Sequence, residues 1–154
     1  MLVDFLKDQD DRVRANAVEA MATVGDMSLV NDILPCLYDK NNRVRANTII
    51  SLWKLGYYQI YEPVIDMLRN PDKWMRASAA FALGELKDTR FLPVLIQCMR
   101  DPEADVRRNV VRSLGKTADP YTLAPYIRPL RFDPDEGVRK AVSDILAAAT
   151  KTKA

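Results

Sequence analysis

Apolar residues recur along the chain at helical spacing, and the pattern repeats about every 31 residues. Val13, Ala17, Met21 and Val24 fall at positions i, i+4, i+8 and i+11, which is typical of a helix and not of a strand. A Val-Arg or Met-Arg pair marks each unit at intervals of 31, 31, 31 and 32 residues: Val13-Arg14, Val44-Arg45, Met75-Arg76, Val106-Arg107 and Val138-Arg139. A fixed period of this length indicates a repeat protein.

A second amphipathic set lies between the marked helices and predicts a second helix in each unit. Its members follow from one another by shifts of 31 residues: Leu29, Ile33, Leu34 and Leu37; Ile60, Val64, Ile65 and Leu68; Phe91, Leu95, Ile96 and Met99; Thr122, Tyr126, Ile127 and Leu130. Gly25 and Gly56 can take the left-handed conformation that ends a helix. Asp119-Pro120 has the form of an N-cap followed by proline at the first helical position.

No strand pattern competes with these helices, so the sequence predicts an all-α fold of about five stacked helical hairpins. We expect one domain over 1–154, with repeats at roughly 1–25, 26–56, 57–87, 88–118 and 119–149. The first repeat is truncated, because its first helix lacks most of an opening turn. Residues 150–154 form a polar tail, and the chain is expected to belong to a longer solenoid, a multidomain protein or a complex.

Composition narrows the class of protein. With 154 residues and 48% hydrophobic content, the chain can form one continuous core. A net charge of +2 is too small to imply a polyanionic partner by itself. No apolar stretch approaches the roughly 20 residues that span a bilayer, which predicts no membrane insertion. The first residues lack the pattern of a signal peptide, and we expect a cytoplasmic location.

The two cysteines occupy the same position two repeats apart. Cys36 and Cys98 are 62 residues apart, so stacked helices would separate them by about 20 Å. A disulfide needs Cα atoms within about 7 Å, so the two cannot pair within one chain. We interpret both as small packing residues.

Specific motifs resemble a known family. The run Asp-Pro-Glu-Ala-Asp-Val-Arg-Arg at 101–108 with Ser-Leu-Gly-Lys at 113–116, and Ala-Leu-Gly-Glu-Leu at 82–86 with Arg76 upstream, resemble HEAT repeats. The form is similar to the short bacterial and archaeal repeats called PBS-lyase-like. The resemblance implies a right-handed, armadillo-like superhelix in which the Val-Arg helix is second in each pair and lines the concave surface. Trp53 and Ile145 depart from the pattern.

The arginine of each Val-Arg pair follows an acidic or amide turn, which favours a structural role. Such an arginine can donate charge-assisted hydrogen bonds to carboxylates and carbonyls of adjacent hairpins. We therefore predict a structural ladder, defined by Arg14, Arg45, Arg76, Arg107 and Arg139. The competing interpretation is a row of anion-binding arginines.

Residues that differ between repeats are better candidates for specificity. Carried over from the family, the concave positions are Arg12, Asn16, Glu19, Arg43, Asn47, Ile50, Trp74, Ser78, Phe81, Asp105, Arg108, Asn109, Arg112, Lys140 and Asp144. Aromatic and arginine side chains are enriched at binding hot spots. We predict a partner-binding site made of Arg43, Asn47, Ile50, Trp74, Phe81, Arg108 and Arg112. In the alternative, Ile50 and Phe81 turn inward to fill space beside the alanines.

Catalysis has little support in the sequence. Histidine is absent, and no phosphate loop, nucleophile elbow or paired metal-ligand spacing occurs. We expect no enzyme activity, cofactor or metal, and predict a scaffold that binds a protein or peptide. A nucleic-acid-binding domain similar to HEAT-like DNA glycosylases is an alternative, although Glu19, Glu85, Asp105 and Asp144 interrupt the basic residues. A bilin lyase-like subunit is another, implied by the resemblance alone.

Overall fold

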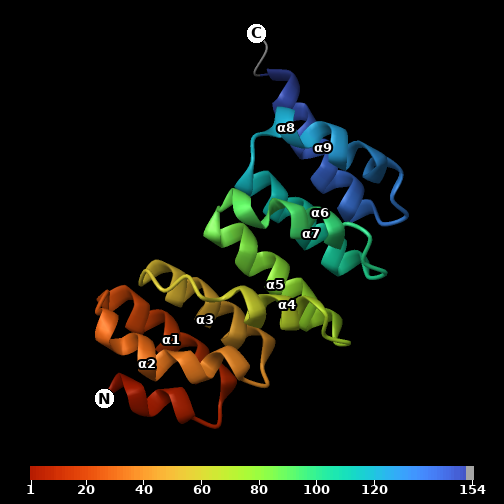
Figure 1. Ribbon diagram of the computed structural model, residues 1–154. Helices are drawn as coiled ribbons and strands as arrows, with labels where there is room; N and C mark the ends of the chain where they lie inside the picture. Colours follow the sequence, from red (N-terminus) through yellow and green to blue (C-terminus); the bar gives the residue numbers. More distant parts are fainter. Residues whose placement is uncertain (152–154) are drawn as a thin grey trace. The chain divides into compact units, whose positions relative to one another are not determined.

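The computed structural model describes residues 1–151, and every regular element among them is a helix (Figure 1). The chain divides into two compact units, residues 1–82 and the residues from Leu83 onward. The all-α class predicted from the sequence is confirmed.

The first unit contains three repeats or parts of repeats. Its elements are η1 (Leu2–Lys7), α1 (Asp11–Val24), η2 (Met27–Leu29), α2 (Val30–Ile33), η3 (Leu34–Tyr38), α3 (Asn42–Lys54), α4 (Tyr61–Leu68) and the larger part of α5 (Lys73–Leu86), where η denotes a 3-10 helix. Helices α1 and α3 carry consecutive Val-Arg pairs and pack directly against each other (Figure 1). Consecutive Val-Arg helices are therefore neighbours in the stack.

The second unit repeats this arrangement. Its elements are the end of α5, η4 (Thr89–Phe91), α6 (Leu92–Cys98), α7 (Ala104–Thr117), α8 (Pro120–Ile127), η5 (Arg128–Phe132) and α9 (Glu136–Lys151). Helix α9 packs against both α7 and α8. Proline lies in the first turn of the first helix in two repeats, as Pro93 in α6 and Pro120 in α8, where the missing N–H is tolerated.

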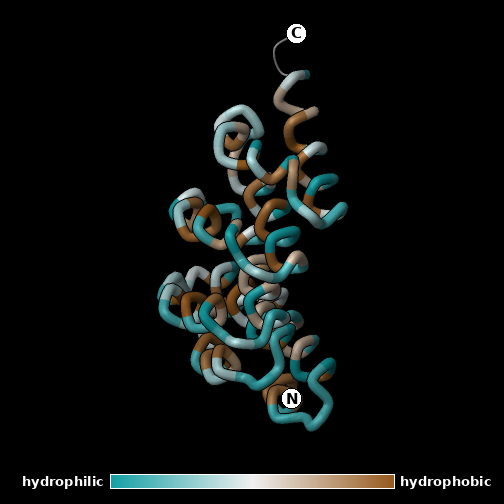
Figure 2. Tube along the Cα trace, turned by 90° about the vertical axis from the view of Figure 1, so that its right-hand side faces the viewer, coloured by the Kyte–Doolittle hydropathy of each residue, from teal (hydrophilic) through white to brown (hydrophobic). Residues whose placement is uncertain are grey.

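The core consists of the apolar positions that repeat. Val44, Met75, Val106 and Val138 are buried, as the period requires, whereas Val13 is only half-buried in the first repeat. Hydrophobic residues recur along the helices and hydrophilic residues along the connecting turns (Figure 2). The repeat period therefore predicts which face of each Val-Arg helix enters the core.

The 31-residue shift is wrong for the first helix of the last repeat. Leu123 and Ile127 are buried, while Thr122 and Tyr126, the positions predicted from the shift, are exposed. The buried Leu95 of the preceding repeat therefore corresponds to Ile127, 32 residues later. The last Val-Arg interval is 32 residues long, so it contains one extra residue. A one-residue shift turns a helical side chain by about 100°. Because the buried residues of α8 already follow the 32-residue shift, the extra residue lies before α8 and not after it.

Helix ends follow the predicted chemistry. Gly25 and Gly56 have φ values of 75° and 83°, and the Asp119 side chain accepts a hydrogen bond from the N–H of Thr122. Lys87 holds the position of these glycines in the third repeat and also has a positive φ, 52°. Thr150, assigned from the sequence to a polar tail, lies inside α9, which continues to Lys151; the remaining tail residues, 152–154, lie outside the described residues.

Small residues allow close helix packing in the second unit. A Cβ atom on Gly84 of α5 would lie 2.5 Å from Oγ and 2.8 Å from Cα of Ser113 on α7. Only glycine fits at this distance. Trp53, which departs from the small-residue pattern one repeat earlier, is half-buried and packs edge-on against Tyr58, with ring centroids 4.6 Å apart.

Candidate functional site

The turn before each Val-Arg helix has the same polar structure in successive repeats. The side chain of its first residue accepts a hydrogen bond from the N–H two residues later, as in Asp39 with Asn41 and Asp133 with Asp135. In four of the five turns the third residue then caps the helix, as when Asn41 accepts from the N–H groups of Arg43 and Val44; the side chain of Glu103 makes no such cap before α7. The arginine side chain returns to this turn, so one motif both begins the helix and positions the guanidinium.

Arg14 and Arg107 join consecutive repeats through two parallel hydrogen bonds. Arg14 donates from Nε and Nη2 to Asp39 at 2.7 and 2.9 Å, and Arg107 donates from the same atoms to Asp133 at 2.8 Å each. Both also donate from Nη1 to two carbonyls of their own turn, at 2.8–3.2 Å. Through these four hydrogen bonds each guanidinium group joins its own turn to the turn of the next repeat, an arrangement that we call a clamp.

The acid partners of these two arginines are held in their charged form. Burial alone would raise the pKa of Asp39, but hydrogen bonds from Arg14 and from the N–H of Asn41 lower it overall. The pKa of Asp133 is lowered chiefly by its hydrogen bond from Arg107, against the effect of burial. Both carboxylates therefore stabilise the fold as anions.

The second repeat departs from this ladder. In the third repeat, Asn70 occupies the position that Asp39 holds in the second. Arg45 therefore does not meet an aspartate there; it donates to Asp66 at 2.7 Å and to the Pro63 carbonyl at 3.4 Å. The Nε atom of Arg45 is buried and has no hydrogen-bond partner among the described residues. One donor of this guanidinium is thus left unsatisfied.

The two remaining ladder arginines also bind their own turns. Arg76 donates to the carbonyls of Asn70 and Pro71, and Arg139 to those of Asp133 and Pro134. All five predicted ladder arginines thus donate hydrogen bonds to carbonyl or carboxylate oxygens of the protein itself, as expected for a structural role.

The predicted concave positions of the first unit lie outside the core. Each of the nine is exposed or half-buried: Arg12, Asn16 and Glu19 on α1; Arg43, Asn47 and Ile50 on α3; Trp74, Ser78 and Phe81 on α5. Hydrogen bonds connect this face across the helices. Nδ2 of Asn42 donates to Oγ of Ser78 at 2.6 Å, and Nδ2 of Asn47 donates to the Ala15 carbonyl at 3.4 Å.

Large apolar side chains are exposed on this face. Trp74 is 52% and Phe81 43% exposed, although both belong to a helix whose other side is buried. The Nζ atom of Lys73 lies 4.8 Å from the centroid of the Trp74 ring, a cation–π contact that leaves a positive charge beside the indole. Phe81 does not turn inward, and Ile50 is half-buried.

In the second unit the same positions are more polar. Arg108 on α7 pairs with Asp105, one turn earlier, and Lys116 pairs with Glu85 of α5. Arg112 on α7 is exposed, as are Lys140 and Asp144 on α9, while Asp105, Arg108 and Asn109 are half-buried. Of the seven predicted partner-binding residues, five thus belong to the first unit and two, Arg108 and Arg112, to the second.

Other chemistry finds little support among residues 1–151. They contain no group of three or more cysteine, aspartate or glutamate side chains placed to hold a metal ion. Neither Cys36 nor Cys98 forms a disulfide, and burial raises the pKa of Cys36, which keeps its thiol protonated. None of the helices between residues 1 and 151 combines the length and apolar character needed to cross a bilayer.

Comparison with known families matches the model for HEAT repeats over residues 1–60, 30–108 and 61–147. The chain belongs to the HEAT repeat family. The overlapping matches cover nearly the whole chain, which agrees with the Val-Arg period. No curated protein sequence matches this HEAT-repeat chain.

Several solved structures share the fold of this HEAT-repeat chain. A chain of the CpcE–CpcF complex of phycocyanin lyase from Nostoc sp. PCC7120 is similar with a TM-score of 0.69 and 23% identity, over 97% of this chain and 64% of that one. This chain therefore spans less than two thirds of that neighbour. A designed armadillo repeat protein in complex with the peptide (KR)4 is similar with a TM-score of 0.56 and 16% identity, over 96% and 80% of the two chains.

Proposed function

We propose that this HEAT-repeat chain is a non-enzymatic scaffold that binds a protein or peptide on the exposed face of α3 and α5. The observation that carries the proposal is the exposure of Trp74 and Phe81 on one helix. They are seven residues apart, two helical turns, so they share a face. Exposed aromatic side chains on a rigid helix are typical anchors of protein interfaces.

The surroundings of these aromatic residues favour an acidic or amphipathic segment as partner. Lys73 carries its charge beside the Trp74 ring, and the exposed Arg43 lies on α3 of the same unit. An amphipathic helix or an extended peptide with carboxylates would place apolar side chains on the aromatic centre and charges at its basic rim. A similar fold binds a peptide in the designed armadillo repeat protein, which supports a peptide-binding role for this one.

The ladder arginines do not compete for this role. Their guanidinium groups are directed to turn carbonyls and carboxylates, so binding of an acidic partner falls to arginines outside the ladder. We therefore expect substitutions of ladder arginines to change the stability of the fold, and substitutions of Trp74 and Phe81, the aromatic centre, to change the affinity for the partner.

The test uses peptides selected from a displayed library against the wild-type chain. Trp74→Ala and Phe81→Ala should each weaken the selected peptides by about 2 kcal/mol, roughly 30-fold, and change the free energy of unfolding by less than about 0.5 kcal/mol. Tyr61→Ala is the matched control, because Tyr61 is a similarly exposed aromatic residue (58%) on α4. It should leave peptide affinity unchanged. Variants that melt early but bind normally once folded would place the two side chains in the core and refute the proposal.

A salt series on the same variants separates a protein interface from a nucleic-acid-binding face. Binding that rests on an apolar centre changes little between 50 and 200 mM salt, whereas phosphate-driven binding of duplex DNA falls by about 10³-fold or more. A steep loss, together with no effect of Phe81→Ala, would favour nucleic acid.

A second candidate function is a subunit of a bilin lyase. It is supported by the similarity to a chain of the phycocyanin lyase complex over 97% of this chain. That structure is of a complex of two proteins, CpcE and CpcF, so this candidate also implies a protein partner. A shift in the absorbance of an added bilin, seen only when a second subunit is present, would favour the lyase function over a scaffold.

A further inference from the structure

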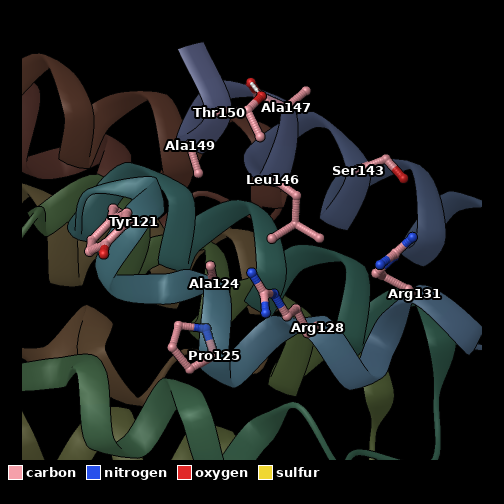
Figure 3. A pocket seen from close by; sticks show the side chains of 10 residues that line it. All are labelled: Tyr121, Ala124, Pro125, Arg128, Arg131, Ser143, Leu146, Ala147, Ala149 and Thr150. Atoms are coloured by element: carbon pink, nitrogen blue, oxygen red, sulfur yellow. Dashed lines mark hydrogen bonds between the residues drawn. The ribbon is translucent and has the colours of Figure 1, made fainter. Parts of the chain in front are cut away.

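A pocket of about 670 Å³ lies between α8, η5 and α9 in the last repeat (Figure 3). Its volume falls within the range of small-molecule sites, about 300–1,000 Å³. All ten residues that line it belong to the second unit, and none is a candidate of the sequence analysis. The pocket thus shares no residue with the surface proposed above, which includes Trp74 and Phe81.

The floor of the pocket is apolar. Leu146 of α9 points toward Ala124 and Pro125 of α8, and Ala147 adds to the apolar lining from α9. Tyr121 lies at the end of the pocket away from η5 and adds an aromatic surface (Figure 3). These side chains suit the hydrocarbon or ring portion of a ligand.

Two arginines line the pocket from η5: Arg128 below Leu146 and Arg131 at the end opposite Tyr121 (Figure 3). The side chains of Arg128 and Arg131 extend from η5 on the side of α9 (Figure 3). Both side chains are exposed, and among the described residues neither guanidinium group has a hydrogen bond or an ion pair. The ten lining residues include no carboxylate, so the positive charge of these two arginines is not neutralised from within the pocket.

These charges do not belong to the repeat pattern. With the corrected 32-residue shift, Arg128 and Arg131 correspond to Ile96 and Met99 of the preceding repeat. Ser143, also in the lining, corresponds to the fully buried Val111. Three positions that are apolar one repeat earlier are polar here, and two carry a guanidinium.

We propose that this pocket binds an anionic amphiphile, a small molecule with an apolar body and a carboxylate, sulfonate or phosphate group. The apolar body lies on Leu146 and Ala147, and Arg128 and Arg131 hold the anionic group by charge-assisted hydrogen bonds. A further apolar helix fits this face less well, because its packing would bury both guanidinium groups without acceptors. Charge complementarity therefore selects an anion.

The first test is a fluorescence titration with 8-anilinonaphthalene-1-sulfonate, which has an aromatic body and one sulfonate. The double variant Arg128→Gln/Arg131→Gln should weaken binding by at least about 10-fold, because it removes both charged donors. Arg128→Lys/Arg131→Lys should retain most of the affinity. The control Lys54→Gln/Arg69→Gln changes two exposed cations of the first unit and should have no effect. Equal binding by wild type and the Gln variant would overturn the proposal.

The second test locates the bound probe. Ala147→Phe fills the apolar floor at an exposed position and should abolish probe binding while the far-ultraviolet circular dichroism stays unchanged. Decanoate should displace the probe, and decanol, which has the same chain without the charge, should not. Displacement by decanol as strong as by decanoate, or normal probe binding to Ala147→Phe, would also overturn the proposal.

Discussion

The arginine clamp of the fourth repeat and that of the second show how one repeated residue depends on its acceptor. Arg107 meets an aspartate in the next turn and satisfies its Nε and Nη2 atoms with two parallel bonds to Asp133. Arg45 meets Asn70 at the equivalent position, turns to Asp66 on α4 and leaves its buried Nε atom unsatisfied. The Val-Arg motif alone therefore does not make the clamp; the aspartate of the following repeat completes it.

This comparison also separates two kinds of arginine. Ladder arginines such as Arg14 are saturated by carbonyls and a carboxylate, so they have few donors left for a ligand. Arginines outside the ladder positions, such as Arg43 and Arg128, are exposed. Position within the repeat thus indicates whether a charge serves the fold or is available to a partner.

The largest expected effect comes from removal of a complete clamp. Arg107→Ala should lower the free energy of unfolding by about 3 kcal/mol, because it leaves the buried carboxylate of Asp133 without its guanidinium. The measurement is urea denaturation followed by circular dichroism. Arg112→Ala, on the exposed side of the same helix, should change stability by less than about 0.5 kcal/mol. Equal effects of the two substitutions would contradict the distinction between ladder and surface arginines.

Acid should weaken the clamps more gently, since a protonated carboxyl group can still accept a hydrogen bond. The pKa values of Asp39 and Asp133 are lowered below the ordinary value of 3.8 in the folded state. Their stabilisation is therefore complete above the unfolded pKa and is lost as the pH falls through the folded pKa. Stability should drop below about pH 4, and Asp133→Asn should flatten this drop relative to the exposed control Asp144→Asn. A drop of the same size in both variants would count against the clamp as its source.

The smallest expected effect repairs the incomplete clamp. Asn70→Asp offers Arg45 the carboxylate that Arg14 and Arg107 already have, and should raise the free energy of unfolding by about 1 kcal/mol. Thermal and urea denaturation of the variant measure the gain. Because the side chain of Asn70 already accepts from the N–H of Asp72, aspartate keeps that bond. If the free energy of unfolding of the variant does not rise, the bond to Asp66 already compensates Arg45 for the missing aspartate.

The sequence predicts the helices and their buried faces well, because the repeat supplies several copies of each signal. Val44, Met75, Val106 and Val138 follow from the period alone. The position of the extra residue before α8 does not follow from the sequence, because apolar residues such as Ile127 and Leu130 fit more than one helical register. The close approach at Gly84 depends on distances between helices, which no local pattern contains.

The candidate site was only partly accessible from the sequence. The exposure of Trp74 and Phe81 agrees with the helix register, whereas the acceptor of Arg45 depends on contacts in three dimensions. Arg128 and Arg131 were missed for a specific reason. They lie outside the Val-Arg helices, and only the 32-residue register of the last repeat aligns them with the apolar Ile96 and Met99.

The clamps also bear on how fast the chain folds. The pairs Arg14–Asp39 and Arg107–Asp133 join residues only 25 and 26 positions apart, and the helix-to-helix bond from Asn42 to Ser78 spans 36. Folding rates of small domains rise as contacting residues lie closer in sequence, because less loop entropy is lost before the contact forms. We therefore expect a nucleus of two adjacent repeats, locked by one clamp, from which each further hairpin is added in turn.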